Sequence, residues 1–174
     1  TPETSDFHNI SLQDALPFSG YQLNADAALP GLVAHGFGPS EIVSKVAEGA
    51  VGFGLVVVRG TSDDQAKLNG TVQFGVSVRD LARENNASGN TQYEDEDVMA
   101  VMKKGYIWVN VADTGSPGAA LNFVNATGVI GVGAAGAGET DLTGWTLEST
   151  VASGGDLDRK STRLNSSHTV ISYA

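Results

Sequence analysis

Short apolar segments with a period of two residues constrain the fold of this chain more than any other feature. In TVQFGVSVR (71–79) the side chains expected on the inner face are Val72, Phe74, Val76 and Val78. In GYIWVNV (105–111) the expected inner side chains are Ile107, Val109 and Val111, with Tyr106, Trp108 and Asn110 on the opposite face. This alternation is typical of strands with one buried face. The β-branched run FGLVVVR (53–59) indicates a strand covered on both faces.

Turn-forming residues separate these segments. The chain has 22 glycines against 5 prolines and no Gly-X-Y period. Gly, Pro, Asn and Asp residues cluster in three segments, 60–64, 113–118 and 125–128. Short strands at such spacing predict an all-β fold, a small antiparallel β-barrel or β-sandwich. Helical patterns are few: a short helix is expected from Ser40 or Glu41, and residues 77–85 admit a strand end or a turn of helix.

The length of 174 residues corresponds to one globular domain with an extended N-terminal arm. The first thirty or so residues show no sustained period, and Pro17 and Pro30 interrupt them. We therefore expect residues 1–40 to form an arm that packs on the body or on a neighbouring molecule. The β-rich domain is expected to span residues 41–157.

The charge of the chain limits its partners. Ten Lys and Arg residues stand against 20 Asp and Glu residues, which gives a formal net charge of −10. A surface of this sign repels phosphate backbones and anionic lipid, so we expect no direct binding to nucleic acid or membrane. No apolar run reaches the length of a membrane span. The expected partners are proteins with basic patches.

The sequence predicts no metal site, no cofactor and no catalytic residue. It has no cysteine, and His8 and His35 are isolated. The acidic run 94–97 lacks the alternating ligands of a calcium-binding loop, which favours a solvated loop before a strand. GVGAAG (131–136) matches the dinucleotide fingerprint, but no helical pattern follows it, which favours a flexible loop between strands.

One motif offers an enzymatic alternative. Asp113, Thr114 and Gly115 resemble the signature of aspartic proteases, in which two carboxylates share a proton, and a homodimer could supply the pair. Those enzymes also need a flap hairpin and a later apolar-apolar-Gly strand, and the only candidate, 129–131, follows within one hairpin. Asp-Thr-Gly is also an ordinary turn sequence, so we expect the chain not to be an enzyme.

Several segments, taken in order, resemble the capsid decoration or "cement" proteins of tailed bacteriophages. They are SKVAEGAVGFGLVVVRGTSDDQAKL, FGVSVRDLARENNA, YEDEDVMAVMKKGYIWVNVAD, SPGAALNFVNATGVI and GWTLESTVASGGDL. The resemblance runs from about residue 44 to residue 157, and the order of the segments argues against chance. The chain departs from the family at two turns, with Asp95, Glu96 and Asp97 in place of a usual Gly-Asp, and with Ala119 in place of Asp in Pro-Gly-Asp.

The resemblance implies a structural role on the outer surface of a virion. Such proteins are small β-barrel or β-sandwich modules that assemble as dimers or trimers on an expanded HK97-like shell and bridge neighbouring major capsid subunits. On this interpretation the expected capsid or subunit contacts are the aromatic residues Phe7, Phe18, Tyr21, Tyr106 and Trp108, although Trp108 could equally cover a sheet face. A β-sandwich module that binds carbohydrate or another protein is the alternative, and the dimeric protease is a distant third.

The last segment differs from the rest of the chain. Residues 158–174 hold three of the ten basic residues, and DRKSTRLNSSH resembles the in-frame translation of a common sequencing adapter. We therefore expect this tail to be non-native, to replace a last apolar strand of the family, and to have side chains that match their surroundings poorly.

Overall fold

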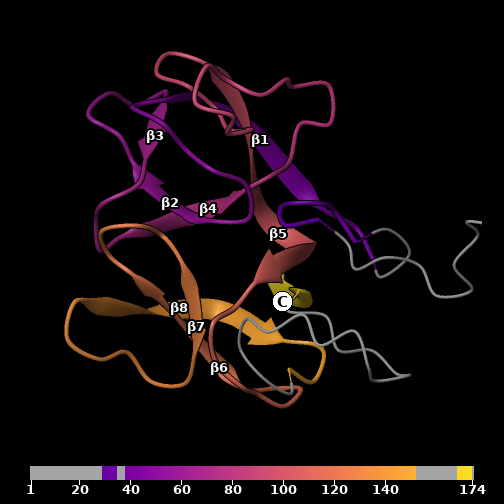
Figure 1. The fold of residues 1–174 in the computed structure, drawn as a ribbon. Coiled ribbons are helices and arrows are strands. Elements are labelled where there is room, and N and C mark those ends of the chain that lie inside the picture. The colour runs from indigo at the N-terminus through magenta and orange to yellow at the C-terminus, as the bar shows by residue number, and fades with distance from the viewer. Residues whose placement is uncertain (1–28, 35–37, 152–167, 174) are drawn as a thin grey trace, which may run out of the picture.

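The structure, a computed structural model, describes residues 29–34, 38–151 and 168–173 (Figure 1). Its elements are β1 (Glu41–Ala47), β2 (Val56–Arg59), β3 (Gln65–Lys67), β4 (Gln73–Ser77), β5 (Val98–Asn110), β6 (Ala120–Val124), β7 (Ile130–Val132), β8 (Glu139–Leu147) and β9 (His168–Tyr173). No helix occurs among these residues, and the prediction of an all-β fold is confirmed. Residues 1–28, which contain most of the expected arm, lie outside the described part.

The first half of the domain is a closed barrel. Its strands follow the order β1-β3-β2-β4-β5, and pairing of β1 with β5 closes the ring. All of these pairings are antiparallel except that of β1 with β3, which is parallel, so the barrel is mixed. The closure leaves few free strand edges within the barrel.

The second half is a sheet that shares β5 with the barrel. Its order is β5-β9-β8-β6-β7, and all its strand pairs are antiparallel. A single parallel bridge from Val111 to Ile130 brings β7 back to the end of β5. Figure 1 shows β1 to β4 above, β6 to β8 below and β5 passing from one group to the other. The 13-residue strand β5 therefore joins both halves.

The buried side chains form two groups, one within the barrel and one shared by both halves. The barrel core consists of Ala47, Val51, Phe53, Val57, Ala66, Tyr93, Met99 and Val101. The larger main core draws on strands of both halves and includes Val56, Val58, Val76, Met102, Ile107, Val109, Phe123, Leu142, Trp145 and Ile171. Alternation along β2 sends Val57 to one core and its neighbours to the other, so the predicted strand with two covered faces is confirmed. The predicted inward positions of β5 are also buried.

Three details of the sequence interpretation need correction. The helix expected from Ser40 or Glu41 is instead strand β1, whose backbone hydrogen bonds go to β3 and β5. In the segment 77–85, Ser77 is the end of β4, as one alternative predicted, and residues 78–85 form neither strand nor helix. Phe74 was expected beside Val76, but the two side chains pack on different cores.

A β-bulge explains the position of Phe74. Val57 pairs with Gly75 whereas Val58 pairs with Gln73, so one extra residue is inserted in β4. A one-residue shift in register sends the following side chains to the other face of the sheet. Phe74 therefore lies half-buried at the barrel surface, and Val72 is 69% exposed.

The acidic turn before β5 contains a residue in a left-handed conformation. Glu96 has φ of 65°. In this conformation a residue with a Cβ atom lowers the free energy of unfolding by about 1 kcal/mol relative to glycine. We expect Glu96→Gly to raise the free energy of unfolding by up to about 1 kcal/mol in urea titrations.

Asn69 is the matched control for this substitution. It has φ of 62°, but asparagine tolerates the left-handed region well, so Asn69→Gly should change stability less. A Glu96→Gly variant no more stable than the wild-type protein would contradict the role assigned to backbone strain.

The C-terminal strand corrects the expectation of a poorly matched tail. β9 pairs antiparallel with both β5 and β8, and its Ile171 is fully buried in the main core. The prediction of poor packing is therefore wrong at Ile171. Backbone hydrogen bonds do not depend on side-chain identity, and HTVISY offers β-branched residues suited to a strand.

Candidate interaction surfaces

Tyr106 and Trp108 lie side by side in β5 on the face away from the main core, and both are half-buried. A short segment that leads in from the arm pairs with the edge of β5 at these two residues. The N–H groups of Gly31 and Ala34 donate to the carbonyl oxygens of Trp108 (2.7 Å) and Tyr106 (2.9 Å), and the Trp108 N–H donates to Leu32 (2.8 Å). The structure thus brings two of the five expected contact residues together. The other three, Phe7, Phe18 and Tyr21, lie outside the described residues.

The base of the arm is fixed by Arg79, just after β4. Its backbone N–H donates to the Gly31 carbonyl (2.7 Å), and its Nε donates to the Pro30 carbonyl (2.9 Å). The guanidinium stacks 4.5 Å from the centre of the Phe53 ring. Burial lowers the pKa of Arg79 below its ordinary value, but the group stays charged at neutral pH. This anchor holds the point at which the arm leaves the body.

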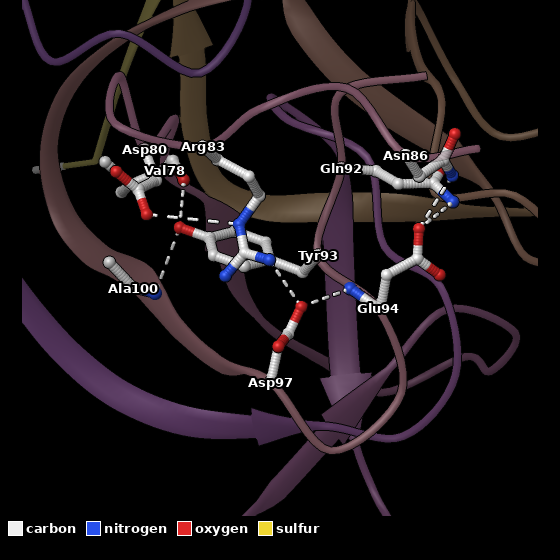
Figure 2. A network of polar contacts seen from close by, with 9 residues as sticks. All are labelled: Val78, Asp80, Arg83, Asn86, Gln92, Tyr93, Glu94, Asp97 and Ala100. Atoms are coloured by element: carbon white, nitrogen blue, oxygen red, sulfur yellow. Dashed lines mark hydrogen bonds and ion pairs between the residues drawn. The ribbon is translucent and has the colours of Figure 1, made fainter. Parts of the chain in front are cut away.

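A polar network orders the long loop between β4 and β5 (Figure 2). Arg83 pairs with Asp97 (2.5 Å) and stacks on the Tyr93 ring at 4.8 Å. Asp97 also accepts the Glu94 N–H (2.6 Å), and Glu94 accepts from the amide of Asn86 (2.7 Å). The acidic run is the predicted loop before a strand, and the carboxylates of Glu94, Asp95 and Asp97 accept hydrogen bonds from groups of the protein. In the part of the chain that the structure describes, no group of His, Asp and Glu residues could hold a metal ion.

Tyr93 is the buried centre of this loop. Its hydroxyl donates to the Val78 carbonyl (2.7 Å) and accepts the Ala100 N–H (3.4 Å). Tyr93→Phe should lower the free energy of unfolding by about 1–3 kcal/mol, because it leaves buried backbone groups without a partner.

Burial raises the pKa of Tyr93 above 10.0, so the wild-type protein should lose stability as the pH rises past about 10. Urea titrations at pH 7 and pH 11 test both effects: equal stability of the two proteins at pH 7 would refute the structural role of the hydroxyl.

A basic patch surrounds Phe74 on the barrel surface. The charged groups of Lys45, Arg59 and Lys103 lie 5.1, 5.4 and 5.4 Å from the centre of its ring. These residues come from β1, β2 and β5, and together with Phe74 we call them the Phe74 patch. Lys45 also donates to the Asp63 carbonyl. Within the described residues, none of the three cations forms an ion pair with a carboxylate.

A shallow hollow of about 320 Å³ adjoins the Phe74 patch. Its lining residues are Glu41, Gln73, Phe74, Lys103, Lys104 and Trp145. Gln73 spans the hollow's rim, because its amide exchanges two hydrogen bonds with the backbone of Thr143 (2.6 and 2.8 Å). The hollow thus lies where the barrel meets β8 of the second sheet.

Sequence reasoning missed the Phe74 patch. The period of two placed Phe74 in the core, and the bulge in β4 that moves it outward has no clear signature in the sequence. The adjacent pair Lys103 and Lys104, within an otherwise apolar strand, was the one available signal. The other cations come from separate strands, so only the pairing of those strands reveals the cluster.

The remaining motifs form no site with the described residues. Asp113 is exposed, and its carboxylate accepts the Val132 N–H (3.3 Å). It therefore connects the turn after β5 to β7. Residues 131 and 132 belong to β7 and not to the predicted loop, whereas residues 133–136 lie in the loop before β8. None of the described elements is a helix that could cross a lipid bilayer.

Comparison with known proteins identifies the family. The family described as "Structural cement protein (E217 gp24/Pam3 gp6)" matches residues 16–158. No curated protein sequence matches the chain. A chain in a solved structure, "The capsid of Myoviridae Phage XM1", is similar with a TM-score of 0.62 and 14% identity, over 88% of this chain and 94% of that one. The likeness to this solved structure shows a shared fold. The family match is a separate finding, and it includes residues of both the barrel and the second sheet. This chain belongs to the phage structural cement protein family.

Proposed function

We propose that this structural cement protein binds the outer face of a phage head and clamps adjacent major capsid subunits. The family match over residues 16–158 is the observation that carries the proposal. The shell is expected to be HK97-like, and the protein is expected to act as a dimer or trimer. Many copies of a weak clamp add up to a strong restraint on a shell that contains pressurised DNA.

The form of the domain supports this role. A closed barrel and a second sheet share one long strand, which gives a module with few free strand edges and two joined halves. The chain carries a formal net charge of −10, which favours basic surfaces of capsid subunits and disfavours the packaged DNA. The expected contacts remain Tyr106 and Trp108 in β5 and the arm residues Phe7, Phe18 and Tyr21.

Cross-linking of decorated heads tests the clamp. Heads stripped of this protein are incubated with the purified chain, and lysine and carboxylate cross-links to the major capsid protein are mapped by mass spectrometry. A clamp predicts cross-links from one cement residue to two capsid sites that are too far apart to be reached on a single subunit. Cross-links confined to one compact region of one subunit would show decoration without bridging.

A non-enzymatic role makes a separate prediction about Asp113. Its carboxylate is exposed and accepts one backbone N–H, and an asparagine oxygen can accept the same bond. The Asp113→Asn variant should therefore bind stripped heads with an affinity within about twofold of that of the wild-type protein. A variant that folds normally but loses a measurable peptidase activity of the wild-type chain would support the protease alternative.

A further inference from the structure

The Phe74 patch has an unusual charge for this protein. Seven Lys and Arg residues lie in the described parts of the chain, and three of them surround one half-buried ring. In addition, Lys104 lines the adjoining hollow. Cations over an aromatic face that lack a carboxylate partner are suited to bind an acidic segment that carries apolar side chains. A chain with a formal net charge of −10 does not need such a cluster for solubility.

The N-terminal arm has the complementary chemistry. Residues 1–28 contain no Lys or Arg, and their acidic residues are Glu3, Asp6, Asp14 and Asp26. The same segment contains three aromatic residues, Phe7, Phe18 and Tyr21. Carboxylates could pair with the cations of the patch, and rings could pack beside Phe74 and in the hollow next to it. We propose that the Phe74 patch binds the acidic, aromatic arm, residues 1–28, of a second copy of this chain.

The length of the arm allows contact with a second copy. Residues 31–34 pair with β5 at Tyr106 and Trp108, and a turn follows towards the N-terminus, in which the Leu32 N–H donates to the Leu29 carbonyl (3.2 Å). An extended segment of 28 residues reaches up to about 90 Å, which is far enough to meet a neighbouring molecule. The proposal concerns contacts between copies and goes beyond the clamp on the capsid.

Photo-cross-linking in solution tests the proposal without any capsid protein. The full chain is prepared with p-benzoylphenylalanine at Phe74 or, in a second variant, at exposed Lys104, and equal amounts of ¹⁴N and ¹⁵N protein are mixed. We expect cross-links from both positions to residues 1–28, and many should join a ¹⁴N chain to a ¹⁵N chain. The same photo-reactive residue at Leu81, which is 74% exposed in the loop before β5, is the control and should not reach the arm.

Charge exchange supplies an independent readout. One variant reverses the patch with Lys45→Glu, Arg59→Glu and Lys103→Glu. The other reverses the arm with Glu3→Lys, Asp6→Lys, Asp14→Lys and Asp26→Lys. Each variant alone should give about tenfold fewer cross-links between copies, and a mixture of the two should restore them. Salt at about 1 M should weaken the wild-type cross-links, because the pairs are exposed.

Several results would overturn the proposal. They are cross-links found only within single chains, cross-links to other segments, no cross-links at all, or no rescue when the two charge-reversed variants are mixed. Because no capsid is present, any of these outcomes would leave the proposed binding to the phage head untouched. Conversely, a chain that fails to bind heads could still show the contact between arm and patch.

Discussion

Gly128→Ala should lower the free energy of unfolding by about 3 kcal/mol or more, although it adds a single methyl group. Gly128 has φ of +70°, and a Cβ at this position would lie 2.3 Å from the carbonyl oxygen of Val56. The Val56 N–H in turn donates to the Gly128 carbonyl (2.8 Å). This contact joins the turn after β6 to the start of β2, and hence the second sheet to the barrel. The added methyl group should push the two halves apart.

Gly118 is the control that distinguishes the steric clash at Gly128 from the backbone strain. It also has a positive φ, +84°, but a Cβ there would meet no atom within 4 Å. Gly118→Ala should therefore cost only the strain of the left-handed conformation, about 1–2 kcal/mol. Urea titrations of the two variants provide the comparison. Equal destabilisation of both would contradict the close contact between the two halves.

Ile107→Ala should lower the free energy of unfolding by about 2–5 kcal/mol. Ile107 is fully buried in the main core, and its backbone pairs with Ile171 of β9 and with Val33 beside the arm. Removing its side chain leaves a cavity next to the strand that both halves share. The loss of stability should be cooperative, with one unfolding transition for the barrel and the second sheet.

Ile42 is the matched control for Ile107. It has the same side chain and also lies in a strand, β1, but it is 42% exposed. Ile42→Ala should cost about 1 kcal/mol or less, mainly through a weaker preference for the strand. If Ile42→Ala were as damaging as Ile107→Ala, the assignment of the main core would be wrong.

Much of the fold was predictable because the strands of this protein show a regular alternation of buried and exposed side chains. Ile107, Val109 and Val111 alternate with more exposed residues in the sequence, and all three are buried in the structure. The run 53–59 was expected to be covered on both faces, and Val57 indeed faces the barrel core while its neighbours face the main core. Burial on one or two faces is a local property of the sequence, so it can be read from the sequence alone.

Pairing between strands was not predictable in the same way. The short segment at Glu41 has no clear alternation, and it forms β1 because β3 and β5 supply partners for its backbone. The bulge at Phe74 likewise arises from the register with β2. Both features depend on residues distant in the sequence, and with them the Phe74 patch depends on the complete fold.

The C-terminal segment forms a strand although we expect its sequence to be non-native. Residues 168–173 form β9, yet the family match ends at residue 158, where the adapter-like sequence begins. The non-native origin of 158–174 stays a prediction. Peptide sequencing of the protein from its natural source tests it, because a non-native tail predicts that no peptide spans Leu157 to Arg159.

Sedimentation of the native phage particles tests the central claim most directly. Virions are purified from the source, and every protein that sediments with them is quantified by mass spectrometry. As a capsid cement protein, this chain should travel with megadalton particles in near-stoichiometric amount to the major capsid protein, and mild treatment should release it without dissolving the shell. If the chain instead remained in the soluble fraction as a free monomer or dimer, the capsid role would be contradicted.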